Sequence, residues 1–136
     1  MKKRIASVLF ALALVLGAFS SHANEVHAAS GVKINTTTFP DKIFRDYVSE
    51  NFDTDGNGYL SREEREEVYQ INVSGLGISN LKGVERFTQI GTLNFSGNSL
   101  KSLDVSNNPR LHTIICSENK LASLTLGEKE NLNILD

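Results

Sequence analysis

The sequence predicts an α+β protein in which a helix-loop-helix segment precedes a short solenoid of repeated strands. Two observations support this fold class. Apolar residues at helical spacing lead into a polar loop at residues 53–64, and a strand-like pattern recurs every 21 residues farther along the chain. We therefore expect two structural parts, residues 38–70 and residues 71–136.

The first helix is expected to run from Pro40 to Phe52. Proline suits the first turn of a helix, because the N–H that it lacks would have no partner there. The helix after the loop is expected to be short, with Ser61 and Glu64 matching the Ser-x-x-Glu capping box at its start. The apolar residues of the first helix are Phe39, Ile43, Phe44, Tyr47, Val48 and Phe52.

Residues 53–64 read Asp-Thr-Asp-Gly-Asn-Gly-Tyr-Leu-Ser-Arg-Glu-Glu, which places oxygen-bearing groups on alternate residues around a tight turn. A calcium ion takes about six to eight oxygen ligands, and such a loop can supply them. Gly58 stands where the chain must turn sharply, and we expect a positive φ there. The predicted ligands are Asp53, Asp55, Asn57, the backbone carbonyl of Tyr59, Ser61 through a water molecule, and Glu64 as a bidentate carboxylate.

This loop resembles an EF-hand, and the resemblance implies Ca²⁺ as the bound ion. The alternative is that aspartate, asparagine and glycine simply form a solvated turn, which these residues favour for local reasons. The helical pattern before the loop and the capping box after it favour the calcium interpretation.

The first 23 residues have the pattern of a secretory signal peptide. Lys2, Lys3 and Arg4 precede an apolar run from Ile5 to Phe19, and small residues follow. The run is shorter than the roughly 20 apolar residues of a membrane-spanning helix, so we expect no membrane anchor. Cleavage is expected after Ala23, with Ala28 as the alternative, and the chain is therefore expected to be secreted or on the cell surface.

Removal of residues 1–23 changes the charge balance. It takes away three of the 14 basic residues and none of the 16 acidic ones, so the remaining 113 residues carry 11 minus 16, or −5. This balance argues against nucleic acid as a partner, because phosphates call for clustered lysine and arginine. Residues 24–37 show no periodicity and are expected to be a flexible lead-in.

The second part is organised by repetition. Leu93, Phe95, Asn98, Leu100 and Leu103 return 21 residues later as Ile114, Cys116, Asn119, Leu121 and Leu124, and Leu135 is expected to begin a third copy. Residues 103–108 repeat the same pattern at about half the period, and residues 71–92 are a variant first unit with a short helical turn.

This pattern resembles leucine-rich repeats, in particular the bacterial kind with nested half-units and internalin-like repeats. In each unit, alternate apolar residues of a short strand would point into a shared core. The resemblance and the spacing predict that Asn98, Asn108 and Asn119 form a ladder of hydrogen bonds to turn backbone, which would otherwise lack partners.

The chain shows no sequence pattern for catalysis, and we expect it not to be an enzyme. It contains no GxSxG, HExxH, CxxC or phosphate-binding glycine loop. Cys116 takes the phase of Phe95 and is interpreted as a buried apolar residue. A catalytic thiol would need an activating base, and the nearby His112 has no evident third partner.

Binding is expected at the outward positions of the strands, which carry small and mostly polar side chains. The resemblance implies a protein or glycan partner on this face. The outward positions are Thr92, Asn94 and Ser96, then Thr113, Ile115 and Ser117, with Ser102, Asp104, Ser123 and Thr125 on the half-units.

We interpret the calcium site as part of the scaffold, because an EF-hand normally pairs with a second one and this chain has a single loop. Phe39, Phe44, Tyr47 and Leu60 are expected to cover the open end of the repeats as an N-terminal cap, with calcium fixing the angle of the two helices. The last strand lacks a polar cap, which favours a chain that is part of a longer surface protein. Two alternatives are an accessory segment of a longer secreted enzyme and a free-standing calcium buffer.

Overall fold

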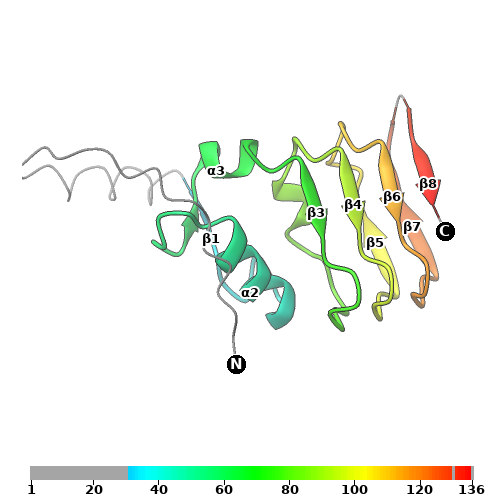
Figure 1. The fold of residues 1–136 in the computed structure, drawn as a ribbon, viewed down its shortest axis with the longest axis horizontal. Helices are drawn as coiled ribbons and strands as arrows, with labels where there is room; N and C mark the ends of the chain where they lie inside the picture. The colour runs from blue at the N-terminus through cyan, green and yellow to red at the C-terminus, as the bar shows by residue number, and fades with distance from the viewer. Residues whose placement is uncertain (1–30, 130, 136) are drawn as a thin grey trace, which may run out of the picture.

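The computed structural model describes residues 31–129 and 131–135, and Figure 1 shows a helical segment at one end of a row of parallel strands. The predicted signal peptide and both candidate cleavage sites, after Ala23 and Ala28, lie outside the described residues. The elements are β1 (Val32–Lys33), α2 (Lys42–Asn51), β2 (Tyr59–Leu60), α3 (Arg62–Glu66), β3 (Gln70–Asn72), the 3₁₀ turn η1 (Val84–Arg86), β4 (Thr92–Asn94), β5 (Ser102–Asp104), β6 (Thr113–Ile115), β7 (Ser123–Thr125) and β8 (Asn133–Leu135).

The repeats form two parallel sheets, one in the order β3-β4-β6-β8 and one that pairs β5 with β7. Leu93 lies opposite Ile71 on one side and Ile114 on the other, so the predicted full units stack in register. The half-units stack separately, with Leu103 opposite Leu124. The nested repeat and the helical turn of the first unit are therefore confirmed.

The prediction that Leu135 begins the third copy is wrong by one residue. Ile134 lies opposite Ile114, which places the third copy 20 residues after the second. Both residues are apolar, so composition does not choose between them. Side chains alternate along a strand, and a slip of one residue exchanges the two faces.

The asparagine ladder is confirmed. Asn98 is buried and its Nδ2 donates to the carbonyl oxygens of Val73 and Phe95, both at 2.8 Å, while its Oδ1 accepts an N–H from the preceding unit at 2.9 Å. Asn119 repeats this arrangement one unit later. Asn108 serves the half-unit, where its Nδ2 bonds to two carbonyls at the 3₁₀ turn η1, both at 3.0 Å. These amides pair backbone groups that the tight turns leave without strand partners.

The first helix begins later than predicted. Asp41 is the N-cap, and α2 runs from Lys42 to Asn51, so Pro40 precedes the cap and is not in the first turn. Asp41 Oδ1 accepts the N–H groups of Ile43 at 2.9 Å and Phe44 at 3.2 Å. An aspartate at this position satisfies helix donors that otherwise lack partners, and it outweighs the preference of proline for the first turn.

The expected flexible lead-in is also corrected where it is described. Residues 31–37 are ordered, and β1 pairs antiparallel with β2, with Val32 opposite Leu60 and Lys33 opposite Tyr59. A turn then joins β1 to the helical segment, with Asn35 Oδ1 accepting the N–H groups two and three residues ahead. Residues 24–30 lie outside the described residues.

The helical segment closes one end of the repeat core. Phe39, Phe44 and Leu60 are fully buried in the same apolar cluster as the repeat residues. The ring of Phe87 lies 6.4 Å from that of Phe39. Phe39 also packs so closely on Gly83 that an added Cβ there would lie 2.2 Å from its Cδ1. The predicted packing of the cap on the first unit is therefore confirmed, with Tyr47 half-buried at its edge.

Burial decreases with distance from the cap. Leu93 and Phe95 are fully buried, whereas Leu124 is half-buried and Ile134 is 47% exposed. Cys116 was expected to be buried, but it is half-buried and packs against the core. Among the described residues β8 is the edge strand of its sheet, so Ile134 has a neighbouring strand on one side only.

Candidate metal centre

The two ends of the loop at residues 53–64 are fixed by helix termini. At its start, the N–H of Phe52 donates to the carbonyl of Val48 and ends α2. At its end, Ser61 and Glu64 form the predicted capping box: Ser61 Oγ accepts the Glu64 N–H at 3.1 Å, and Glu64 Oε2 accepts the Ser61 N–H at 2.8 Å. Ser61 therefore begins α3, and the two ends of the loop are held in place.

Three of the six predicted ligand residues come together at one point. Asp53, Asp55 and Glu64 each offer a carboxylate oxygen, and these oxygens lie within 4.8 Å of one another. Oxygens bound to one calcium ion at about 2.3–2.6 Å are separated by at most about twice that distance. The three carboxylates therefore fit a single calcium ion.

The carboxylate of Glu64 is held by four hydrogen bonds. Its Oε1 accepts the N–H and the hydroxyl of Thr54 at 2.7 and 2.8 Å, and its Oε2 accepts the N–H and the hydroxyl of Ser61 at 2.8 and 2.9 Å. Burial acts to raise the pKa of Glu64, but these hydrogen bonds outweigh it and the pKa lies below its ordinary value. Glu64 therefore stays charged and oriented across the loop.

The pKa of Asp53 lies above its ordinary value. Burial raises its pKa, the neighbouring carboxylates of Asp55 and Glu64 raise it further, and the N–H groups of Gly58 and Asn57 oppose the rise without cancelling it. Like charges brought together in a partly buried site repel one another, and a cation between them would remove that repulsion.

The other predicted ligand residues take supporting positions. Asn57 donates from Nδ2 to Asp55 Oδ2 at 2.7 Å, and its Oδ1 accepts the Tyr59 N–H at 2.8 Å. Tyr59 lies on β2, and Ser61 is used as the helix cap. The positive φ expected at Gly58 is confirmed at 82°.

Two contributors to the loop, Thr54 and β1, have no recognisable signal in the sequence. Thr54 is the second residue of the loop, a position at which the EF-hand pattern requires no particular residue. Its residue type therefore does not indicate that it binds Glu64. The strand β1 is two residues long and pairs across more than 25 residues of sequence, so it has no periodic pattern by which to recognise it.

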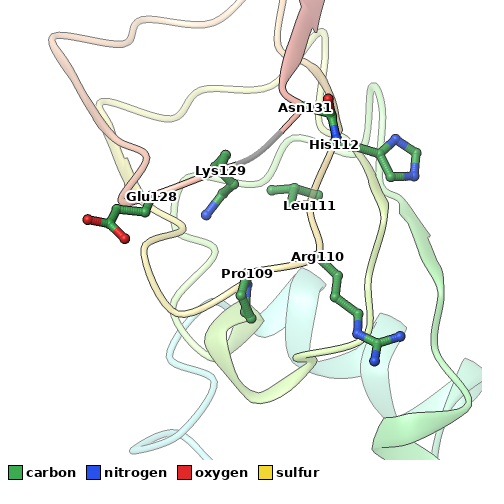
Figure 2. A pocket seen from close by; sticks show the side chains of 7 residues that line it. All are labelled: Pro109, Arg110, Leu111, His112, Glu128, Lys129 and Asn131. Carbon is green, nitrogen blue, oxygen red and sulfur yellow. The ribbon is translucent and has the colours of Figure 1, made fainter.

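A separate hollow of about 770 Å³ lies away from the loop, near the later repeats. Figure 2 shows that its charged side chains do not converge, since Arg110 and Glu128 point in different directions. Lys129 donates from Nζ to the backbone carbonyl of Val105 at 2.9 Å. The hollow therefore does not present the few convergent polar groups that mark a binding site.

The outward face of the four-stranded sheet carries uncharged side chains. Two rows cross the strands in register, one of Gln70, Thr92, Thr113 and Asn133, and one of Asn72, Asn94 and Ile115. Hydroxyl and amide groups dominate both rows. A second hollow, of about 400 Å³, lies beside the loop at residues 53–64 and is lined in part by Thr54, Glu64, Tyr69 and Gln70.

Solved structures share this architecture. The functional domain of InlJ from Listeria monocytogenes, whose structure includes a cysteine ladder, superposes with a TM-score of 0.60 at 21% identity, over 79% of this chain and 28% of that one. An internalin (InlF) from Listeria monocytogenes gives a TM-score of 0.54 at 24% identity, over 80% of this chain and 35% of the other. The fold is that of internalin-like leucine-rich repeats.

The internalin-like fold accounts for the stacked strands, and the predicted resemblance is confirmed at that level. The chain spans about a third of the length of these internalin-like structures, 28% and 35% respectively. No model of a known protein family matches the chain. A search of curated proteins found no match either. Among the residues that the structure describes, no helix has the length and apolar character needed to cross a membrane.

Proposed function

We propose that the chain is a secreted interaction module in which calcium, bound at residues 53–64, stabilises the N-terminal cap of a leucine-rich repeat array. The observation that carries this proposal is the meeting of Asp53, Asp55 and Glu64 in a loop whose two ends are fixed by helix termini. Acidic residues on a turn without fixed ends would not be held in this way. Calcium would supply the positive charge that three converging carboxylates lack.

The ligand set is the one predicted from sequence. Asp53, Asp55 and Glu64 would contribute carboxylates, with the Asn57 side chain and the Tyr59 carbonyl completing the oxygen set. Ser61 would act through a water molecule, because its hydroxyl is used in the capping box. Hydroxyl hydrogens rotate freely, so the bonds from the Thr54 and Ser61 hydroxyls to Glu64 are those that an ion could displace.

The scaffold role follows from the position of the loop between the two helices of the cap. Phe44 and Val48 on α2 and Leu60 on β2 are fully buried in the repeat core. Holding the two ends of the loop together therefore holds these side chains in place. Extracellular calcium modules can work with Kd values of about 10⁻⁴ to 10⁻³ M, which suits a structural ion.

Terbium luminescence tests the metal site, because the ring of Tyr59 borders the loop and can sensitise a bound lanthanide. We expect luminescence that calcium competes away, and we expect Asp53→Ala to lose it. Glu50→Ala is the matched control, since it removes one exposed acidic residue of the same helical segment outside the loop. Equal luminescence from Asp53→Ala and the parent would show that the metal assignment is wrong.

Thermal unfolding tests the scaffold role. A ligand that binds only the folded state at 100 times its Kd adds about 2.7 kcal/mol of stability. We expect the melting midpoint of the parent to rise with calcium and that of Asp53→Ala to stay constant. A parent midpoint that does not move at saturating calcium would contradict the scaffold role, even if the ion binds.

The interaction role rests on the uncharged outward face, which offers hydroxyl and amide groups for hydrogen bonds to a protein or glycan. Thr113 lies at the centre of one row and is half-buried, so Thr113→Arg would block the face. We expect ligands found on glycan or protein arrays to be lost with Thr113→Arg and kept with Thr36→Arg, a control at an exposed turn. Ligands that bind Thr113→Arg as well as the parent would place the binding surface elsewhere.

A further inference from the structure

The strand β1 contacts the calcium loop at the position where EF-hands contact one another. β2 consists of Tyr59 and Leu60, the seventh and eighth residues of the loop, and β1 pairs antiparallel with it. The N–H of Ile34 continues the pairing and donates to the carbonyl of Gly58 at 2.9 Å. Among the described residues, the loop at residues 53–64 supplies the only acidic cluster of metal-binding geometry, so a second loop is not what pairs with it.

The register determines which backbone groups of the loop face β1. Opposed residues of an antiparallel pair alternate between hydrogen-bonded and non-hydrogen-bonded positions. Because Ile34 and Gly58 are hydrogen-bonded, Lys33 and Tyr59 fall in a non-hydrogen-bonded pair. The polar backbone groups of Tyr59 therefore point away from β1 and toward the loop, which agrees with the bond from its N–H to Asn57 Oδ1 at 2.8 Å.

The pairing thus orients a predicted calcium ligand. If Tyr59 were in a hydrogen-bonded pair, its carbonyl would point at β1 and could not bind the ion. Because Ile34 fixes the Gly58 carbonyl toward β1, the carbonyl of Tyr59, one residue further along the strand, faces the opposite side, toward the loop. The arrangement costs no extra ordering when the ion binds, because the strand pair already exists.

Side chains of β1 also contact the apolar core and the ring of Tyr59. Val32 and Ile34 are half-buried and pack against the core that contains the fully buried Leu60. The Nζ of Lys33 lies 5.8 Å from the centre of the Tyr59 ring, at a distance suited to a cation–π contact. The strand is therefore attached by backbone and side-chain contacts together.

From this geometry we infer that β1 is an integral part of the calcium site and replaces the second EF-hand, so that a single loop binds calcium in a monomer. The inference rests on the calcium function proposed above. Both candidate signal-peptide cleavage sites, after Ala23 and Ala28, precede β1 and leave it in the exported chain.

Proline substitution separates the hydrogen-bonded position from its neighbour. Ile34→Pro removes the N–H that Gly58 accepts, whereas Lys33→Pro removes an N–H that does not face β2. Ile34→Ala keeps the N–H and shortens the side chain. None of these variants replaces a predicted ligand, and circular dichroism of each reports whether the fold is retained.

We expect Ile34→Pro to raise the calcium Kd, measured by terbium competition, by about tenfold, which corresponds to the loss of about one net hydrogen bond. Lys33→Pro and Ile34→Ala should stay within about threefold of the parent, since they keep that bond. If the parent binds calcium and Ile34→Pro binds it equally well, or if both proline variants lose affinity equally, this inference is overturned while the proposed function stands. A parent that binds no calcium overturns both.

Two measurements on the unaltered chain test the role of β1 in calcium binding even if Ile34→Pro fails to fold. Amide hydrogen exchange at Ile34 should slow when calcium is added, because ion binding and strand pairing stabilise each other. Exchange that calcium leaves unchanged would overturn the inference. Analytical ultracentrifugation should show a monomer with and without calcium, and a calcium-dependent dimer would mean that a second copy takes the place assigned to β1.

Discussion

Asp41 connects the cap to the repeats, and replacing it with alanine should destabilise the whole fold. Its Oδ1 caps α2, and its Oδ2 accepts the N–H of Ser79 at 2.9 Å, the hydroxyl of Ser79 at 3.1 Å and the N–H of Asn80 at 3.2 Å. One carboxylate thus holds a helix start and a turn of the first repeat unit 38 residues away.

The expected loss has two parts. Removing an aspartate N-cap costs about 1 kcal/mol. Hydrogen bonds to a charged acceptor contribute about 1.5–3 kcal/mol where they are shielded, and the lower end applies at Asp41 because the freed N–H groups can reach water. We therefore expect Asp41→Ala to lower the free energy of unfolding by about 2–3 kcal/mol. For a folded unit of this size, that loss lowers the melting midpoint by about 10–20 °C.

Urea unfolding followed by circular dichroism measures this difference, with Asp46→Ala as the control. Asp46 lies on the same helix and forms an exposed ion pair with Lys42, so its loss should cost less than about 0.5 kcal/mol. If Asp41→Ala and Asp46→Ala unfold at the same urea concentration, the assignment of Asp41 as the link between cap and repeats is refuted.

The pH dependence gives an independent check. Burial acts to raise the pKa of Asp41, but hydrogen bonds from Ser79, Phe44 and Ile43 outweigh it, and the folded pKa lies below the ordinary value of 3.8. A carboxyl group with a lowered folded pKa stabilises the fold above its unfolded pKa and loses that effect as pH falls through the folded pKa. The difference between the parent and Asp41→Ala should therefore be constant from neutral pH down to about pH 5 and shrink below about pH 3.8.

Three further substitutions test the ladder, the core and the loop. Asn98→Ala leaves buried backbone groups without partners and should cost about 3 kcal/mol in urea unfolding, whereas Asn107→Ala, at an exposed position, should cost less than about 0.5 kcal/mol. Phe87→Ala removes a fully buried ring between cap and repeats and should cost about 3–5 kcal/mol; a smaller loss than that of Asn98→Ala would contradict its central place. Gly58→Ala meets no atom within 4 Å, so its cost of about 1–2 kcal/mol comes from the φ of 82° alone, and a calcium Kd equal to that of the parent would show that this turn does not shape the site.

The sequence was sufficient for the features that depend on local or repeated patterns. The carboxylates of Asp53, Asp55 and Glu64 follow from the spacing of a single loop, and the register of Leu93 with Ile114 follows from a 21-residue period. The capping box at Ser61 is likewise a local signal, and the structure contains it. In each case the residues that decide the structure lie near one another in the chain or recur in phase.

Prediction failed where distant or competing contacts decide. The strand β1 is set by pairing with β2, and two residues carry no periodicity of their own. The start of α2 depends on Asp41, whose second oxygen is engaged by the first repeat and so fixes the cap position from outside the helix. The predicted start of the third unit was wrong by one residue because Ile134 and Leu135 are both apolar. Only the strand pairing distinguishes them.

The position of the cap at the N-terminal end of the repeats also bears on how the chain is made. The cap and the first repeat unit, which leave the ribosome before the later units, supply the fully buried rings of Phe39, Phe44 and Phe87. In a solenoid each unit contacts only its neighbours, so a folded first layer is a template on which the next can dock. The fold is thus suited to vectorial assembly during synthesis, with each unit docking on the one before it.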